Sequence, residues 1–293
     1  MNLPALVGLL IMVVSEAATL ARIEPFWSWN TPIAWTGFIL FADSVVHRAR
    51  GQSWLRTSTR EFVWLALASI PLWLVFEFYN LFIDNWSYVG LPDNRGLRLF
   101  GYAWSFATIW PAIFEGADLV AVWRGRVRAT VFAPRSGRRR SPSGFSTSRL
   151  FPAPLSMALG AALLAWPLIW PSRYLAAPVF LGFIVLLDPV NARLGGEALA
   201  HDFDRGNLDR IQNLVLSGFL CGVLWEFWNY WSRAKWHYTV PIMERFKVFE
   251  MPLPGYLGFP AFALECFTMY VFVRLVAAAA TGRSARTGRT IAL

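Results

Sequence analysis

Lysine and histidine are scarce in this chain of 293 residues, and charged residues make up only 15% of it. The two lysines, Lys235 and Lys247, fall in one connecting segment, so no lysine in an apolar run can form a Schiff base with retinal. The three histidines are not spaced as metal or haem ligands. A soluble domain carries roughly a quarter charged residues. These shortages argue against a rhodopsin, a histidine-based metal protein and an ordinary soluble domain.

Cysteine is equally rare, and Cys221 and Cys266 each lie inside an apolar run. Two isolated cysteines make neither a disulfide framework nor a metal-binding spacing, so we expect packing residues. The HDFD segment at 201–204 is interpreted as a solvated loop rather than a metal site. No glycine-rich phosphate loop, nucleophile elbow or dinucleotide fingerprint occurs. The sequence predicts no metal and no cofactor, and leaves carboxylates, amides and aromatic rings for any chemistry.

Hydrophobic residues are abundant, at 56% of the chain, and they gather in long runs. Runs of this length cross a bilayer as helices. We therefore predict an all-α polytopic membrane helical bundle with about eight transmembrane helices. The first run resembles a signal peptide but does not begin with basic residues, so we expect it to be a retained helix. The runs fall near 3–21, 29–47, 61–83, 104–123, 152–170, 174–192, 210–231 and 257–279.

The basic residues, 27 in all, lie mostly in the short connectors between apolar runs. Cytoplasmic connectors of membrane proteins carry an excess of arginine and lysine. With the N-terminus inside, the inner connectors hold most of the basic residues. We therefore expect a protein of the bacterial inner membrane with both termini in the cytoplasm. The positive charge is read as contact with anionic lipids, and nucleic acid is not an expected partner.

Two halves of the chain repeat the same landmarks in the same order. TGFILFADSVVHRARG at 36–51 aligns without a gap on LGFIVLLDPVNARLGG at 181–196. Further along, the motifs FEFYN, WSY and WPAIFE recur in the second half as WEFWN, WHY and FPAFALE. Each copy has four apolar runs, and an even number gives both copies the same orientation. The sequence thus predicts parallel repeats related by an axis along the membrane normal.

Domain boundaries follow from this repeat and from the composition between the copies. The intervening segment is rich in Arg, Ser, Gly and Pro, which is typical of a flexible linker. We expect a first four-helix membrane repeat at 1–125, a basic cytoplasmic linker at 126–150, a second four-helix repeat at 151–280 and a basic cytoplasmic tail at 281–293.

Carboxylates and amides recur at matching places within the apolar runs. Glu77 and Asn80 in the first copy correspond to Glu226 and Asn229 in the second. The spacing of three residues places each pair on one helix face. A carboxylate within a bilayer is costly and usually faces a bundle interior or a cavity. Since drift removes costly residues that have no role, we interpret these pairs as a functional site.

A second matched pair of acids, Glu115 and Glu265, stands in the last run of each copy. Glu265 follows Pro260 and is expected in the first turn of the eighth helix. The preceding EMPLPGYLGFP segment is too rich in proline for a regular helix and is expected to form a re-entrant loop. These expectations give two near-symmetric acidic sites, or one shared site, in the outer half of the membrane.

Asp43 and Asp188 form a secondary polar pair nearer the cytoplasmic ends of their runs. Two interpretations stay open for them: solvated residues at a helix end, or part of a functional site.

Aromatic residues beside the acids form a further group of candidates. Tryptophan belts at the membrane surface explain many of the 16 tryptophans, and a pocket lining explains others. Aromatic faces beside a carboxylic acid suit a cationic or polyene ligand. The candidate substrate-binding residues are Trp225, Trp228, Trp236, Tyr238, Trp86 and Tyr88.

The order of these landmarks resembles one known family. Glu226, WHY at 236–238 and FPAFALE ending at Glu265 are similar to motifs of the lycopene cyclase domain, found in small heterodimeric and tandem-repeat membrane cyclases of carotenoid biosynthesis. Glu77, WSY and WPAIFE repeat the order in the first copy. The chain has a single glutamate where the family has an acidic pair. It also has four apolar runs per copy where the family has three spans.

The resemblance implies a membrane isomerase that uses acid–base chemistry without redox steps. Such cyclases protonate a terminal alkene, let the carbocation close a ring and then remove a proton. Glu226 and Glu265 are the expected acid and base, and Asn229 would orient them. Glu77, Asn80 and Glu115 would form the second set. The implied substrate is an isoprenoid or similar lipid.

Two alternatives remain open from the residues alone. Paired carboxylates at a repeat interface also suit a proton- or ion-coupled carrier. Polar pairs that only join helices would make the protein a non-catalytic membrane scaffold.

Overall fold

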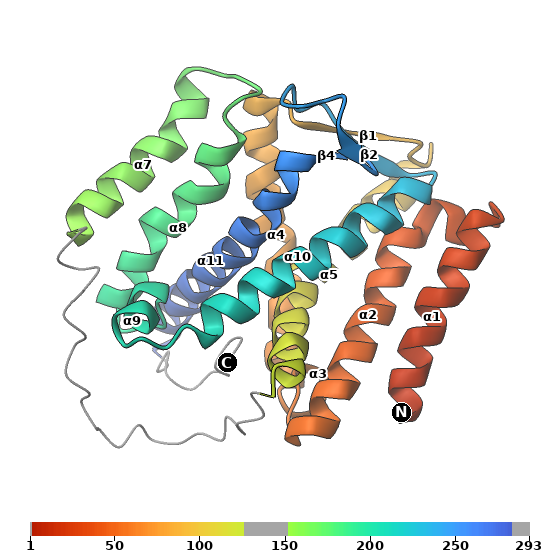
Figure 1. The fold of residues 1–293 in the computed structure, drawn as a ribbon, viewed down its shortest axis with the longest axis horizontal. Coiled ribbons are helices and arrows are strands. Elements are labelled where there is room, and N and C mark those ends of the chain that lie inside the picture. The colour runs from red at the N-terminus through yellow and green to blue at the C-terminus, as the bar shows by residue number, and fades with distance from the viewer. Residues whose placement is uncertain (1, 126–151, 283–293) are drawn as a thin grey trace.

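The computed structural model describes residues 2–125 and 152–282, so the predicted linker and nearly all of the predicted tail lie outside the described residues. The described part is a bundle of long helices with a few short strands (Figure 1). Its helices are α1 (Leu3–Leu20), α2 (Phe26–Arg50), α3 (Trp54–Thr57), α4 (Thr59–Ile83), α5 (Arg95–Trp123), α7 (Ala153–Ile169), α8 (Ala176–Arg193), α9 (Leu199–Asp204), α10 (Asp209–Trp231) and α11 (Gly258–Ala280). Its strands are β1 (Trp86–Val89), β2 (Lys235–Tyr238), β3 (Lys247–Val248) and β4 (Met251–Pro252).

Six helical segments of the described chain are long and apolar enough to cross a membrane. They are α1, α4, α5, α8, α10 and the segment Leu253–Ala280, which contains α11. Helix α7 is apolar but has only 17 residues, and α2 is not among the six although it has 25. Asn30, Asp43 and a basic last turn make α2 more polar than its neighbours. The all-α helical bundle is confirmed, and the six apolar segments are compatible with an integral membrane protein, while the predicted eight spans stay a prediction.

The helices are arranged with one hairpin on each side of a central group (Figure 1). The α1–α2 pair lies at one side, and the α7–α8 pair lies at the other. Between them are α4, α5, α10 and α11. Helix α2 packs against α5, α8 packs against α11, and α10 packs against both α5 and α11. The short helices α3 and α9 lie at the end of the bundle opposite β1 and β2.

Glycine allows close contact within each hairpin. A Cβ atom on Gly8 of α1 would lie 2.6 Å from the carbonyl oxygen of Gly37 on α2, and a Cβ on Gly37 would lie 2.8 Å from that of Gly8. In the other hairpin, a Cβ on Gly160 would lie 2.5 Å from the backbone nitrogen of Leu186. Small residues at such crossings are characteristic of helices that pack inside membranes.

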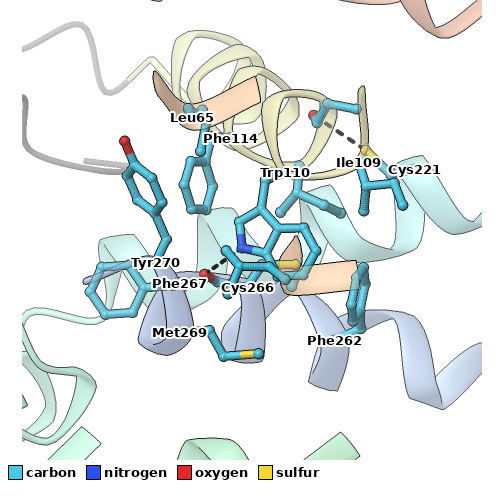
Figure 2. Close-up of a cluster of buried hydrophobic side chains, with 14 of the residues drawn as sticks. Leu65, Ile109, Trp110, Phe114, Cys221, Phe262, Cys266, Phe267, Met269 and Tyr270 are labelled. Carbon is cyan, nitrogen blue, oxygen red and sulfur yellow. Dashed lines mark hydrogen bonds between the residues drawn. The ribbon is translucent and has the colours of Figure 1, made fainter. Parts of the chain in front are cut away.

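The core lies where α5 and α11 meet (Figure 2). Trp110 of α5 is fully buried, and its indole N–H donates to the carbonyl of Cys266 on α11 at 2.9 Å. Phe262 packs edge-on against Trp110, with ring centroids 5.6 Å apart. Cys221 and Cys266 are both free and buried, as expected for packing residues.

The segment before α11 is irregular, as its prolines predicted. It consists of β4, one short 3-10 stretch over Leu253–Leu257, and the start of α11 at Gly258. The expectation for Glu265 was wrong in detail, because α11 begins before Pro260 and Glu265 therefore lies two turns inside the helix. A proline is tolerated in the first turn of a helix because its missing N–H would have no partner there.

Candidate functional site

A two-stranded ribbon joins the two halves of the chain above the helices. Strands β1 and β2 pair antiparallel, with Trp86 opposite Tyr238 and Tyr88 opposite Trp236. Side chains alternate between the faces of a strand, so the Trp and Tyr of each motif share one face. Those four rings point inward, whereas Ser87 and the opposite histidine are exposed. The sequence did not predict these strands, because four residues are too few for a periodic pattern.

The first-copy ribbon motif binds the carboxyl group of Glu77 on α4. The indole of Trp73, one turn earlier on α4, donates to Glu77 Oε1 at 2.8 Å. The indole of Trp86 donates to the same oxygen at 3.2 Å, and the hydroxyl of Tyr88 donates at 2.5 Å. Burial, followed by the nearby Glu77 charge, raises the pKa of Tyr88 well above its usual value. Tyr88 therefore keeps its proton and remains a donor.

Glu226 on α10 has the matching position but fewer donors. It is fully buried, and the hydroxyl of Tyr238 donates to its Oε1 at 3.0 Å. Within the described residues no hydrogen bond of normal geometry reaches Oε2, although the backbone of Glu250 lies near the carboxyl group. Burial, followed by the nearby Glu226 charge, raises the pKa of Tyr238 well above its usual value. The two acids therefore have different environments despite their matching motifs.

The two asparagines hold the ribbon in place. Asn80 donates to the carbonyl of Trp86 at 2.8 Å and accepts from its backbone N–H at 3.2 Å. Asn229 does the same with Trp236, at 2.9 Å in both directions. Each side-chain amide thus makes the two backbone hydrogen bonds to a tryptophan that a neighbouring strand would otherwise make. The asparagines position the motifs that contact Glu77 and Glu226, and do not themselves touch either acid through a described hydrogen bond.

A cavity of about 490 Å³ lies beneath the ribbon. Aromatic side chains from α2, α4, α5, α8, α10 and α11 contribute to its wall, together with the inner face of the ribbon. Trp73 and Trp225 meet within it at a centroid separation of 6.0 Å. Ligand pockets for small molecules have volumes of roughly 300–1,000 Å³ and mostly apolar linings. The size and chemistry of the cavity suit a small apolar molecule or part of a longer one.

Most of the predicted substrate-binding residues line this cavity. They are Trp86, Tyr88, Trp225, Trp236 and Tyr238. Trp228 is not part of the lining and packs edge-on against Trp35 at 4.9 Å. Trp35, Trp73 and Phe262 line the cavity although sequence reasoning did not select them. Trp73 precedes Glu77 by one helical turn, and this spacing is the signal by which the sequence could have identified it.

The structure does not bring Glu226 and Glu265 together in any described contact. Glu265 is fully buried on α11, and its neighbours include Tyr79 and the backbone of Phe183 on α8. Neither of its carboxyl oxygens makes a hydrogen bond of normal geometry within the described chain. Glu115 is likewise fully buried, on α5. None of the four glutamates lines the described cavity. Glu77 and Glu226 are connected to it by hydrogen bonds from Tyr88 and Tyr238, which do line it.

Asp43 and Asp188 are both buried, so their interpretation as solvated helix-end residues was wrong, and each instead caps a following short helix. Asp43 accepts from the backbone N–H of Leu55 at 2.8 Å, in the first turn of α3. Asp188 accepts from Leu199 at 2.6 Å and Ala200 at 2.9 Å, in the first turn of α9. A carboxylate that caps a helix satisfies N–H groups that lack an intrahelical partner.

Asp188→Ala is expected to lower the free energy of unfolding by about 1–3 kcal/mol, because it leaves one buried and one half-buried N–H group without this acceptor. Thermal unfolding of the detergent-solubilised protein measures the loss. Asp188→Asn keeps one acceptor oxygen and should lose less. Equal unfolding temperatures for wild type and Asp188→Ala would contradict the capping role.

Ionic contacts at this same end were not predicted. The HDFD segment is not a solvated loop, because it forms α9 and its Asp202 is buried. Arg210 lies 2.8 Å from Asp202 and 2.7 Å from Glu197, and its guanidinium group stacks over Phe267. Charges in connectors were interpreted as topology signals, and nothing in the sequence distinguishes the buried ones.

Comparison of the chain with protein-family models, with curated proteins and with solved structures finds no match.

Proposed function

We propose that this protein is an integral membrane isomerase that holds an isoprenoid or similar apolar chain in the cavity and rearranges it by proton transfer. The observation that carries the proposal is the pairing of two glutamates, Glu226 buried and Glu77 half-buried, with two tyrosines that line one aromatic cavity. The resemblance to lycopene cyclases and the apolar lining support a polyene or other isoprenoid. Aromatic faces stabilise a passing carbocation.

The two glutamates suit opposite roles. Glu77 accepts three hydrogen bonds, from Trp73, Trp86 and Tyr88, and so has several donors around the oxygen that would receive a proton. An unpaired charge is very costly to bury, and Glu226 accepts one hydrogen bond of normal geometry, from Tyr238, with the Trp236 side chain and the Glu250 backbone nearby and no described cation. The proposal takes Glu226 as the acid and Glu77 as the base, each acting through its tyrosine. Two carboxyl groups in different environments divide acid and base work in this way.

The proposed step balances without an oxidant or a cofactor. For this step the hydrogen bond between the two residues reverses, so that protonated Glu226 donates to the Tyr238 oxygen while the Tyr238 hydrogen passes to one carbon of an alkene, whose π electrons form the new C–H bond. The resulting cation is attacked by a second alkene or shifts along the chain. A proton then leaves a neighbouring carbon through Tyr88 to Glu77, and its C–H electrons form the new double bond. One proton enters and one leaves, so the product is an isomer.

The proposal also takes the chain as two parallel repeats of four helices. Three matched features support it. Asp43 caps α3 as Asp188 caps α9, and each asparagine binds a tryptophan backbone by hydrogen bonds. The third feature is the register of the ribbon. Exchange of the two copies maps the Trp-x-Tyr pairing of the ribbon onto itself. Under this proposal α2 and α7 also cross the membrane. Both termini face the cytoplasm of a bacterial cell, as the basic connectors favour.

Filling the cavity tests the binding part of the proposal. Ala177 on α8 lines the cavity, so Ala177→Trp is expected to exclude the ligand by its bulk. Lipids that co-purify with wild type and variant are extracted and compared by mass spectrometry. The amount of bound isoprenoid should fall at least about tenfold, which corresponds to 1.4 kcal/mol of lost binding.

Ala162→Trp is the matched control, because Ala162 lies on α7, is exposed and does not line the cavity. It should retain the wild-type ligand. No isoprenoid on the wild-type protein, or equal amounts on both variants, would refute binding in this cavity.

A further inference from the structure

The charged side chains that line the cavity are all basic. They are Arg98, Arg173 and Lys235, and no aspartate or glutamate appears in the described lining. Arg98 lies in the first turn of α5, Arg173 precedes α8, and Lys235 begins β2. All three therefore stand in or beside the connecting segments at the ribbon end of the bundle. An aromatic cavity with positive charge at one end is suited to an amphiphile rather than to a plain hydrocarbon.

Two of these three cations already have acidic partners. Arg173 pairs with Asp84, and Lys235 Nζ lies 2.6 Å from Glu250. Burial raises the pKa of Glu250, but the hydrogen bond and charge of Lys235, together with His237, outweigh it and hold the pKa below its usual value. Neither Arg173 nor Lys235 therefore offers an uncompensated charge to the cavity.

Arg98 is different. Its Nε–H donates to the carbonyl of Pro92 at 3.1 Å, and no carboxylate pairs with its guanidinium group within the described residues. It is half-buried in the cavity wall, at the N-terminal turn of a long helix. The partial positive charge of a helix N-terminus also favours an anion. Arginine presents several N–H donors in a planar fork that matches phosphate oxygens.

The neighbours of Arg98 connect it to the proposed chemistry. Tyr102 follows one turn later on α5, and its ring packs against Tyr88 with centroids 5.3 Å apart. Tyr88 in turn donates to Glu77. A head group at Arg98 would place the first bonds of an attached chain beside Tyr88, and the rest among Trp73 and Trp225.

We propose that the ligand is an isoprenoid with an anionic phosphate head, which Arg98 binds while the chain fills the aromatic cavity. This inference rests on the proposed function and narrows its substrate class. Lycopene and other plain hydrocarbons have no group for Arg98. Phospholipids share the phosphate chemistry, so the test separates them from isoprenyl phosphates.

Binding is measured by quenching of tryptophan fluorescence, since six tryptophans line the cavity. The full chain in phosphatidylcholine nanodiscs is titrated with geranylgeranyl phosphate and with geranylgeraniol, which share the chain and differ in the head. Wild type should bind the phosphate about 10- to 100-fold more tightly, as expected for a hydrogen-bonded charge pair. Arg98→Gln should remove that preference and leave binding of the alcohol unchanged.

Arg95→Gln is the control, because Arg95 shares the same helical turn, is exposed and does not line the cavity. It should keep the wild-type preference. Equal affinity of wild type for phosphate and alcohol, or an equal loss of both in Arg98→Gln, would overturn the head-group assignment. Displacement of geranylgeranyl phosphate by phosphatidylglycerol at equal concentration would overturn the isoprenoid assignment in favour of a phospholipid. Failure of both compounds to bind would instead count against the proposed function.

Discussion

Under the proposed function, Glu226→Gln is expected to lower the conversion of the proposed isoprenoid substrate by about 10²- to 10⁴-fold, the usual contribution of a general acid. Glutamine has the size of a protonated glutamic acid and can still accept the hydrogen bond that Tyr238 donates at 3.0 Å. The fold and the cavity should therefore remain, and only the transferable proton is lost.

Deuterium uptake from heavy water measures this step directly, because protonation of an alkene adds a solvent hydrogen to carbon. Membranes containing wild type or Glu226→Gln are supplied with lycopene or with geranylgeranyl phosphate. The products are separated by chromatography, and their deuterium content is measured by mass spectrometry. Glu16→Gln is a suitable control, since Glu16 also lies in an apolar helix but does not line the cavity. Wild-type product with no deuterium, or full activity of Glu226→Gln, would refute the proposed acid. A carrier would form no product and would change proton uptake in the variant.

Arg210→Met is expected to reduce the free energy of unfolding by about 3–5 kcal/mol, the cost of removing one partner from a buried ion pair. The Arg210 side chain is only 2% exposed and contacts Asp202 at 2.8 Å and Glu197 at 2.7 Å. Methionine fills the space over Phe267 but leaves Asp202 buried without this cation. The start of α10 should separate from α9 first, since these contacts join the two elements.

Thermal unfolding in detergent, followed by circular dichroism, measures the loss. Arg205→Met removes an exposed arginine from the same connecting segment and should leave the unfolding temperature nearly unchanged. The combined variant Arg210→Met with Asp202→Asn should recover part of the stability, because the remaining buried charge is removed. If Arg210→Met unfolds at the same temperature as Arg205→Met, the ion pair does not stabilise the fold.

Composition and pattern were sufficient for the coarse architecture. Long apolar runs must form helices in a bilayer, since each backbone polar group there needs a partner within its own segment. The sequence therefore predicted the membrane bundle without any knowledge of contacts. The number of spans was less certain, because α7 is short and α2 carries polar residues such as Asn30 and Asp43.

Pairing within the site could not be predicted in the same way. The matched acids were visible in the sequence, but Glu226 and Glu265 share no contact, whereas Glu226 meets Tyr238 twelve residues later. That contact depends on the ribbon, and the ribbon depends on how α4 and α10 place the two halves against each other. The partners of the asparagines could not be predicted either. The spacing of three residues placed Asn80 on the same helix face as Glu77, but its hydrogen-bond partner is the backbone of Trp86.

By itself the sequence determined which residues must be buried in an apolar environment, because hydrophobicity and helix period are properties of local segments. Tertiary structure alone decided which buried polar groups meet, since a hydrogen bond depends on positions set by packing across the whole bundle. Arg98 illustrates the difference. In the sequence it is one arginine among many in the connectors, and in the fold it faces an aromatic cavity without an acidic partner among the described residues.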